Sequence, residues 1–244
     1  CISSFFAGVG GGLFAMFANQ AQAKTFTTSM TYEILLIVVI GGMLLGLIAA
    51  VLCNKAFPGI RVFSTSYALP MAIASSSAAM IFQIMLHPAV GIVNKLLGLD
   101  INWLNDPFYA KVVIILGLIW RWTGYNMVFY LSAMQGIEYS IYEAARIDGA
   151  NQVQQLFKIT IPLLKPIILV TAIMSTNGTL QLFDESVNLT RGGPANMTIT
   201  MSHYIYNTMF TKNPNFGYAA AMSFVILVMV AVLAAIQMKV GDKR

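Results

Sequence analysis

The segment between residues 137 and 165 combines acidic and small side chains in a pattern that could do chemistry. It contains two short groups, Glu143-Ala144-Ala145 and Asp148-Gly149-Ala150. Acid–base catalysis needs partner groups, and this segment has no histidine or cysteine to complete a site. The same residues suit a protein contact, because alanine and glycine permit close approach and a carboxylate can bind a basic partner. The alternative is an ordinary surface connector, and the residues alone favour neither.

A second group surrounds Arg121 inside an apolar stretch. Arg121 and Tyr125 share one helix face by their spacing, and Trp122 lies beside them. Aromatic faces stack on sugar rings, and guanidinium and phenol groups bond hydroxyls, so these residues are candidates for a sugar-binding cavity. The alternative is an interfacial belt, in which Trp and Tyr lie at headgroup depth and Arg extends toward water. Arg121 lies about ten residues into its stretch, near the middle at about 1.5 Å per residue, which favours the cavity.

The next apolar stretch carries a polar face formed by Ser175 and Thr179, which helical spacing places together. These hydroxyls are candidates for the same substrate path. Hydrogen bonding to a partner helix explains them equally well, because Ser and Thr commonly make such contacts in membranes.

Motifs for catalysis and metal binding are absent from the sequence. The glycine-rich run Gly8–Gly12 leads into Leu13-Phe14 and lacks the Lys-Ser or Lys-Thr that a phosphate-binding loop needs. His87 and His203 are isolated in the sequence, and we expect both to be solvated. Cys1 and Cys53 form no metal-ligand pattern. The sequence therefore predicts no catalytic residue, no metal site and no ATPase activity in this chain.

Composition places these groups in a membrane protein. Of the 244 residues, 58% are hydrophobic and 9% are charged, whereas about a quarter are charged in an ordinary soluble domain. So few charged side chains cannot cover a soluble surface, which disfavours a soluble enzyme. The basic residues are scattered between apolar runs, so the net charge of +5 fits the loops of a membrane protein better than nucleic-acid binding.

Five apolar stretches approach or exceed the roughly 20 residues that a membrane-spanning helix needs. They are Ile34–Leu52, Ser66–Leu86, Ala110–Ala133, Pro166–Phe183 and Tyr218–Met238. The predicted fold class is therefore an all-α, polytopic membrane bundle.

The first residues do not form a sixth complete stretch. Glycines interrupt the apolar segment Cys1–Ala18, and each disfavours a helix by about 1 kcal/mol relative to alanine. We interpret residues 1–25 as the tail of a first span followed by an external loop, and residues 26–244 as the transmembrane domain. We expect the complete gene to encode more apolar sequence before Cys1.

The basic residues predict the orientation in the membrane. One side holds Lys55, Arg61, Arg146, Lys158, Lys165, Lys239, Lys243 and Arg244, and the other holds Lys24, Lys95, Arg191 and Lys212. The side richer in Lys and Arg faces the cytoplasm. This places the segment 137–165 and the C-terminus in the cytoplasm, and the segments His87–Tyr109 and Asp184–Phe216 outside.

Local signals predict how the segment 137–165 folds. Ile141–Ile147 should form a short helix, which Gly149 ends by adopting a left-handed conformation. Asn151 can cap a second helix. This helix should end before Pro162. It would place three apolar side chains on one face, those of Val153, Leu156 and Phe157.

The segment resembles the EAA loop of permease subunits in bacterial ABC importers. The resemblance rests on Glu143-Ala144-Ala145, Asp148-Gly149-Ala150, Phe157, Ile159, Pro162 and Pro166. Further residues resemble the carbohydrate branch of this family, which imports maltose and other oligosaccharides: Ile101–Leu104, Pro107, Trp120–Met127, Phe183-Asp184, Leu189-Thr190, Gly192–Pro194 and Thr198. The resemblance covers the chain from Phe26 to its end, and the preceding residues match poorly.

The resemblance implies a MetI-like helical bundle in the bacterial inner membrane that forms half of the pathway of an ATP-driven sugar importer. It implies a second homologous permease, two ATPase subunits that hold ATP and Mg, and an external solute-binding protein. No cofactor is expected on this chain. The EAA loop would be a coupling helix whose contact residues are Glu143, Ala144, Ala145, Asp148, Gly149 and Ala150. The substrate path would include Arg121, Trp122, Tyr125, Ser175 and Thr179.

Two alternatives stay open. An importer of the same architecture for another solute, such as glycerol phosphate, would use Arg121 to bind the anion. An ion-coupled secondary transporter would need acids inside its spans, whereas Glu33 and Asp184 only border the predicted spans.

Overall fold

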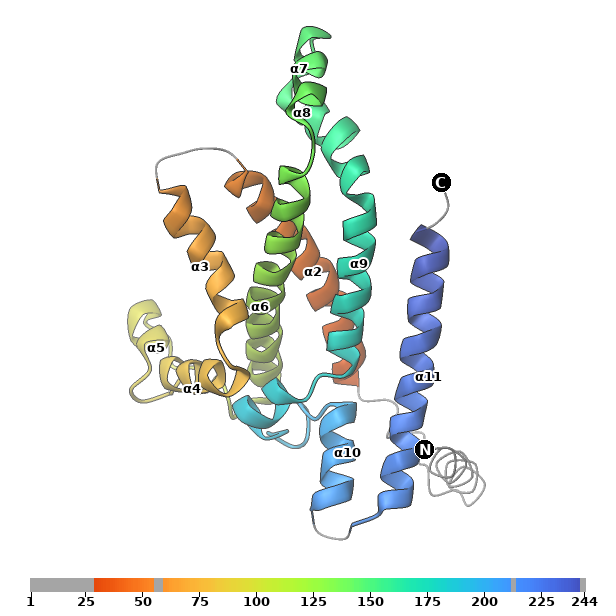
Figure 1. Cartoon of the computed structure of the whole chain (residues 1–244). Helices are drawn as coiled ribbons and strands as arrows, with labels where there is room; N and C mark the ends of the chain where they lie inside the picture. Colours follow the sequence, from red (N-terminus) through yellow and green to blue (C-terminus); the bar gives the residue numbers. More distant parts are fainter. Residues whose placement is uncertain (1–28, 55–58, 212–213, 242–244) are drawn as a thin grey trace. The chain divides into compact units, whose positions relative to one another are not determined.

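The computed structural model describes residues 29–54, 59–211 and 214–241, and every regular element in these ranges is helical. The elements are α2 (Ser29–Cys53), α3 (Ile60–Ala72), α4 (Ser75–Met85), α5 (Ile92–Leu97), α6 (Pro107–Gln135), α7 (Tyr139–Ile147), α8 (Gln152–Gln155), η2 (Leu156–Thr160), α9 (Ile161–Leu180), η3 (Ser186–Thr190), α10 (Met201–Phe210) and α11 (Phe216–Gly241) (Figure 1). This confirms the all-α fold class. The interpretation of residues 1–25 falls outside the described residues.

Four helices in the described ranges are each long and apolar enough to cross a membrane. They are Ile34–Cys53, Pro107–Gln135, Gln152–Leu180 and Phe216–Gly241. Each contains most or all of one apolar stretch predicted from the sequence. Length and composition therefore confirm four of the five predicted spans as single helices.

The fifth predicted span, Ser66–Leu86, is not one continuous helix. The helix stops after Ala72 and restarts at Ser75, so the two pieces count as a span only as a bent pair. Ala74 is extended, with φ −60° and ψ 141°, and it precedes three consecutive serines. Serine favours helix starts over helix interiors because its hydroxyl competes for backbone hydrogen bonds. Hydrophobicity alone does not reveal this break.

The helix that begins after Asn151 continues through Pro162, so the prediction that it ends there is wrong. α8 leads through the π-helical turn η2 directly into α9. In η2 the Ile161 N–H donates to the Leu156 carbonyl, five residues earlier. Pro162, which has no N–H to donate, directly follows this wider turn, and the helix continues past it. One helix therefore connects the segment 137–165 to the membrane.

The chain divides into two compact units. The first comprises residues 1–37, 73–117 and 176–234, and the second comprises residues 38–72, 118–175 and 235–244. Several long helices contribute residues to both units. The core of the second unit consists of buried side chains from α2, α6 and α9, namely Ala49, Ala50, Cys53, Met127, Tyr130, Met134 and Leu164. Tyr130 also makes a 2.9 Å hydrogen bond to the Thr171 hydroxyl.

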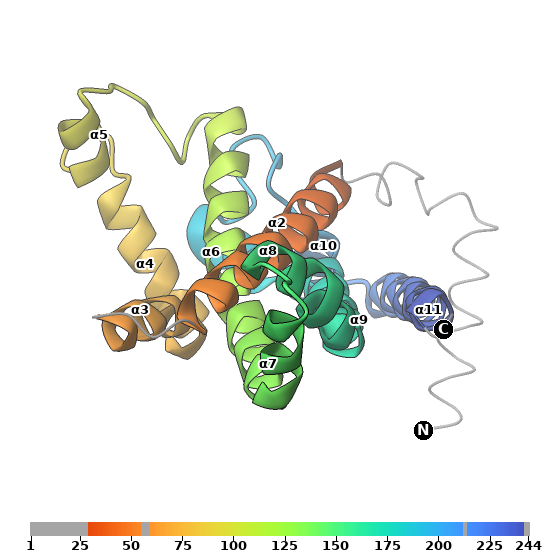
Figure 2. The ribbon, with the colours of Figure 1, turned by 90° about the horizontal axis from the view of Figure 1, so that it is seen from above.

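Within the second unit, α2 crosses α6 at two glycines spaced by one helical turn (Figure 2). A Cβ atom added at Gly42 would lie 2.9 Å from the Trp122 Cβ. A Cβ added at Gly46 would lie 2.5 Å from the Asn126 Cβ and 3.1 Å from the Met127 backbone nitrogen. Small residues at this spacing let two membrane helices approach closely. The glycines therefore set the distance between α2 and α6.

Replacing Gly46 should destabilise the second unit. We expect Gly46→Ala to lower stability by about 1–3 kcal/mol, because the new methyl group overlaps the Asn126 Cβ. Gly41→Ala is the matched control, since its Cβ would lie 3.4 Å from the flexible end of Ile119. Gly41→Ala should leave the free energy of unfolding unchanged or raise it by about 0.5–1 kcal/mol. Thermal unfolding midpoints of the purified proteins check this, and equal midpoints for the two variants would contradict the close crossing.

Candidate functional site

The predicted short helix of the segment 137–165 is α7, which begins at Tyr139 and includes all of Ile141–Ile147. Together with α8 it projects beyond the ends of α6 and α9, to which the two short helices are joined (Figure 1). The prediction of a helical connector between two spans is confirmed.

The chain reverses direction between α7 and α8 through a closely hydrogen-bonded turn. Gly149 has φ +81°, as predicted, and the space beside it is open. The Gly149 N–H donates to the Arg146 carbonyl at 3.0 Å, and the Ala150 N–H donates to the Ala145 carbonyl at 2.8 Å. This pattern is a Schellman motif, in which a left-handed residue closes the helix. Glycine is favoured here because L-residues with a Cβ rarely adopt this conformation.

Asn151 then starts the next helix, again as predicted. Its side chain accepts from the Gln154 N–H at 2.8 Å, and its own N–H donates to the Gln154 side chain at 2.9 Å. This reciprocal pair is a capping box, which satisfies two backbone donors that the helix start leaves open. The turn is thus fixed on both sides by local hydrogen bonds.

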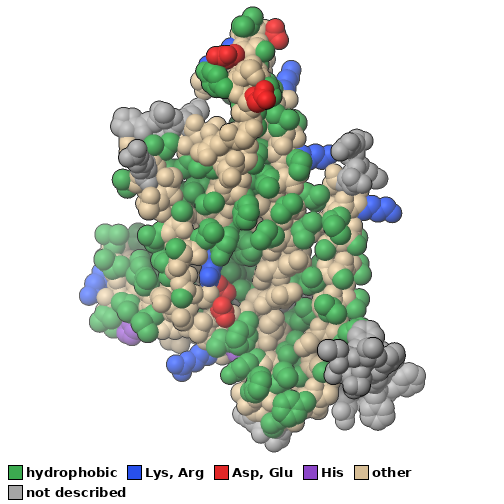
Figure 3. Space-filling model, in the orientation of Figure 1, with side chains coloured by type: hydrophobic (Ala, Val, Ile, Leu, Met, Phe, Trp, Pro, Cys, Tyr) green, Lys and Arg blue, Asp and Glu red, His purple; other side chains and the backbone are tan. Residues whose placement is uncertain are grey.

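The outer surface of this connector is acidic and apolar. Glu143, Ala144, Asp148 and Gly149 are exposed, and the other two predicted coupling residues, Ala145 and Ala150, are partly buried. Red acidic and green hydrophobic side chains gather at this end of the molecule (Figure 3). Within the described residues the Glu143 side chain has no hydrogen bond or ion pair. Its carboxylate is therefore available to a partner.

Apolar side chains extend this surface. Ile147 is 87% exposed, and Val153 and Phe157 are each 63% exposed. Leu156 is partly buried and lines a cavity instead, so the three predicted side chains do not form one uniform face. Sequence reasoning missed Ile147, although its position next to Asp148 in the turn was an available signal. Several exposed apolar side chains on one surface segment are typical of a protein contact.

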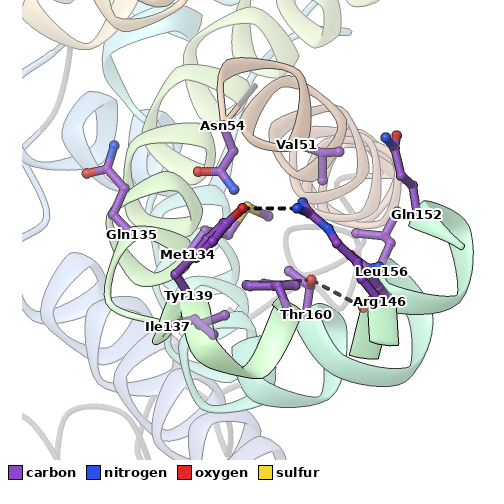
Figure 4. A pocket seen from close by; sticks show the side chains of 12 residues that line it. Val51, Asn54, Met134, Gln135, Ile137, Tyr139, Arg146, Gln152, Leu156 and Thr160 are labelled. Atoms are coloured by element: carbon purple, nitrogen blue, oxygen red, sulfur yellow. Dashed lines mark hydrogen bonds between the residues drawn. The ribbon is translucent and has the colours of Figure 1, made fainter. Parts of the chain in front are cut away.

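A cavity of about 490 Å³ lies on the inner side of the connector. Its walls come from the ends of α2 and α6 and from α7, α8 and η2 (Figure 4). Arg146 and Tyr139 meet within it, since the Arg146 Nη1 donates to the Tyr139 hydroxyl at 2.9 Å. Sequence reasoning did not find this cavity, because its walls come from segments far apart in the chain.

The predicted substrate-path residues fall on two helices. Arg121, Trp122 and Tyr125 lie near the middle of α6 and are all partly buried, with the two rings 5.6 Å apart. Ser175 and Thr179 are fully buried on α9. Thr179 belongs to the first compact unit and the other four residues to the second. A cavity shared by all five residues therefore stays a prediction.

Two further polar residues of α6 are buried beside this group. Thr123 is 3% exposed and Asn126 is 1% exposed. The Thr123 hydroxyl and the Asn126 Nδ2 have no hydrogen-bond partner among the described residues. Polar groups inside a membrane helix are functional candidates because their burial is costly. Thr123 escaped the sequence reasoning, although its spacing of three residues from Asn126 was a signal.

The segment after α9, in the first unit, is held by buried hydroxyl groups. Thr198 Oγ1 donates to the Gly193 carbonyl at 2.7 Å and lies 2.6 Å from Thr190 Oγ1. Thr200 donates to the Leu182 carbonyl at 2.6 Å. Three of the residues that carry the resemblance to carbohydrate permeases, Thr190, Gly193 and Thr198, are therefore joined by hydrogen bonds in this loop.

His203 is buried in this loop, so the expectation that it is solvated is wrong. It is 4% exposed, and its Nδ1 lies 2.8 Å from the Ser186 hydroxyl. Ser186 donates its single proton to the Thr198 carbonyl at 2.7 Å. It must therefore accept from His203, which fixes the proton of the neutral ring on Nδ1. Burial of the ring lowers the pKa of His203 below its ordinary value.

Known proteins resemble this chain over most of its length. The family described as "Binding-protein-dependent transport system inner membrane component" matches residues 42–242. The lactose transport system permease protein LacF of Rhizobium radiobacter is 48% identical over 206 residues, which cover 81% of this chain and 69% of that protein. The sulfoquinovosyl glycerol transport system permease protein SmoG of Agrobacterium fabrum is 36% identical over 219 residues, covering 88% and 70%.

A solved structure shares the fold. The crystal structure of a bacterial ABC transporter involved in the import of the acidic polysaccharide alginate aligns with a TM-score of 0.85. The alignment covers 94% of this chain and 83% of that one, at 22% sequence identity. This likeness shows that the two chains share a fold.

The buried His203 should make stability depend on pH. Its folded-state pKa is lowered, so between that value and the ordinary pKa the unfolded chain binds more protons. The free energy of unfolding therefore falls as pH drops below the ordinary histidine pKa of about 6.5. We therefore expect the protein to have a lower thermal unfolding midpoint at about pH 5.5 than at about pH 7.5, because histidine titrates between these two pH values.

His203→Asn should reduce this fall, because the amide can still donate to Ser186 and does not titrate. His87→Asn is the control, since His87 is exposed, and it should leave the fall unchanged. Thermal scans of the three proteins at both pH values make the comparison. An equal fall in the wild type and in His203→Asn would show that His203 does not carry the effect.

Proposed function

The chain belongs to the family of binding-protein-dependent transport system inner membrane components, and we propose that it forms half of the pathway of an ATP-driven sugar importer. The observation that carries this proposal is the connector between α6 and α9. It presents a free carboxylate, small residues and exposed apolar groups on a rigid turn between two membrane helices. We assign it the role of the coupling element that contacts an ATPase subunit.

The contacts within the connector suit the transmission of force. Thr160 donates to the Gln155 carbonyl at 3.3 Å, so Tyr142 is the donor in its 2.9 Å hydrogen bond to the Thr160 hydroxyl. Gln155 Nε2 donates to the Ala150 carbonyl at 2.8 Å. The bond between Tyr142 and Thr160 ties α7 to η2, which continues into α9, and the bond from Gln155 ties the turn to the end of α8. A displacement of α7 would therefore move α9 as well as the end of α6.

The proposed assembly contains a second homologous permease, two ATPase subunits that bind ATP and Mg, and an external solute-binding protein. The family description names a binding protein, which supports the last of these. We place the connector and the C-terminus in the cytoplasm, because Lys and Arg are more numerous in the loops on that side. Glu143 would bind a basic residue of the ATPase subunit. Ala144 and Ala145 would allow close approach, and the turn at Asp148, Gly149 and Ala150 would fix the connector.

A carbohydrate is the proposed cargo. The names of the similar lactose and sulfoquinovosyl glycerol permeases support a sugar or glycoside. On α6, the neighbouring rings of Trp122 and Tyr125 can stack on a sugar, and Arg121 can bond its hydroxyls. Ser175 and Thr179 would add hydroxyl contacts from α9. A second candidate is an anionic solute such as glycerol phosphate, which the positive charge of Arg121 near the middle of α6 favours.

Reversing the charge of Glu143 should uncouple the chain from its ATPase. We expect Glu143→Lys to lower both the amount of ATPase subunit that co-purifies and the rate of uptake. Losing one member of a buried charge pair costs about 3–5 kcal/mol, which far exceeds the roughly 0.5 kcal/mol of an ordinary surface change. Glu138→Lys is the matched control, since Glu138 is an exposed acid of the same connector whose carboxylate accepts a 3.3 Å hydrogen bond from the exposed Ser140 hydroxyl.

The measurement uses a tag on this chain, quantifies the retained ATPase subunit and follows uptake in the same cells. Glu138→Lys should keep the wild-type amount of co-purified ATPase subunit and the wild-type rate of uptake. If Glu143→Lys also retained both, the connector would not be the coupling element.

Removing the guanidinium of Arg121 should impair uptake but not assembly. We expect Arg121→Ala to raise the apparent KM for the sugar by about tenfold, the equivalent of about 1.4 kcal/mol of binding. Arg121→Lys keeps the charge and should recover uptake if an anion is the cargo. Competition between neutral and phosphorylated sugars separates the two candidates. Unchanged kinetics in a fully assembled Arg121→Ala complex would remove this residue from the path.

A further inference from the structure

The cavity beneath the connector lies where two membrane spans end. Val51 and Asn54 are at the end of α2, and Met134 and Gln135 are at the end of α6. The apolar spans Ile34–Cys53 and Pro107–Gln135 stop at the same places. Phospholipid headgroups lie at the boundary between the hydrocarbon core and water, where such spans end. The cavity is therefore at headgroup height.

Its lining is both apolar and polar. The apolar side chains are Val51, Met134, Ile137 and Leu156, and uncharged polar side chains come from Asn54, Gln135, Gln152, Gln155 and Thr160. A volume of about 490 Å³ falls within the range of about 300–1,000 Å³ typical of small-molecule sites. A ligand with a polar head and an apolar tail would match both kinds of wall.

Arg146 is the only charged side chain among the described residues that line this cavity. Tyr139, two turns earlier on α7, holds it in place through the 2.9 Å hydrogen bond, and the guanidinium carbon lies 5.6 Å from the centre of the Tyr139 ring (Figure 4). Within the described residues the guanidinium makes no other hydrogen bond and no ion pair. Its remaining N–H donors suit an oxyanion, and the planar guanidinium binds phosphate in a two-pronged geometry.

We propose that this cavity binds the headgroup of an anionic phospholipid, with the phosphate on Arg146 and the glycerol and upper acyl chain against Val51, Met134 and Leu156. Basic pockets between membrane helices on the cytoplasmic side are known to hold such headgroups. The proposal rests on the proposed function for the side of the membrane that the connector faces. A bound lipid would bridge the ends of α2 and α6 to α7, so anionic lipid would control how firmly the coupling element is held.

The test measures lipid bound to the intact complex. The complex is purified through a tag on this chain and equilibrated with vesicles of phosphatidylcholine and phosphatidylglycerol. Native mass spectrometry then counts the lipids retained. We expect the wild type to retain phosphatidylglycerol preferentially, and Arg146→Gln to lower its retention about fivefold, as expected for one basic group at an anionic surface. Lys158→Gln is the matched control, because Lys158 is exposed on η2 outside the cavity, and it should change retention less than about twofold.

A second variant fills the cavity without changing its charge. Asn54 is exposed at the rim, and Asn54→Trp should also lower retention while the thermal midpoint stays that of the wild type. Retention equal to the wild type in Arg146→Gln and Asn54→Trp would overturn the proposal. Inorganic phosphate is added in a separate arm. Loss of the bound lipid at millimolar phosphate would identify free phosphate as the ligand and would also overturn it.

This readout needs neither uptake nor ATPase activity, so it fails independently of the proposed function. Selective lipid retention combined with normal ATPase co-purification in Glu143→Lys would refute the coupling role and leave the lipid site intact. If Glu143→Lys lost the ATPase subunit while the wild type showed no preference for phosphatidylglycerol, the coupling role would stand and the lipid site would be refuted.

Discussion

The reversal of the chain between Asp148 and Asn151 is the constraint on which the rest of the connector depends. A helix that leaves the membrane must have its last carbonyls satisfied, and the helix that returns must have its first N–H groups satisfied. Here a left-handed glycine and a capping box do both within a few residues. No long loop is needed, so α7 and α8 form one rigid projection. A flexible connector would absorb a displacement of α7, so the proposed coupling role requires a rigid one.

The π-helical turn η2 completes this mechanical link. A helix that stopped before Pro162 would leave a hinge between the connector and the membrane. The wider turn instead carries the helix past the proline, and the Tyr142 hydroxyl bonds to Thr160 on the same turn. π-Bulges are frequent at functional sites because they change the direction of side chains without ending the helix. In this chain the bulge joins the connector, the cavity and α9 in one element.

Features set by local sequence could be predicted, and features set by distant partners could not. The lengths of the apolar stretches predicted four of the spans. The conformational preference of Gly149 and the capping preference of Asn151 predicted the turn, because the physical cause lies within a few residues. The burial of His203 depends on Ser186 and on the loop folded around it, so the sequence near His203 does not reveal it. The cavity has the same origin, since α2 contributes a wall far from α7 in sequence.

The candidate site on α6 shows where local and global requirements conflict. Close packing at Gly46 buries Asn126, whose amide nitrogen has no hydrogen-bond partner among the described residues. The buried hydroxyl of Thr123, one turn earlier, has no partner among them either. Each such group costs about 1–3 kcal/mol. In the loop around His203, by contrast, the hydroxyls of Ser186, Thr198 and Thr200 are bonded to the backbone. Conflicts of this kind are expected at functional sites. The costly polar groups of α6 therefore fit a transport path better than a structural core, and they lie on the same helix as the residues that we propose for sugar binding.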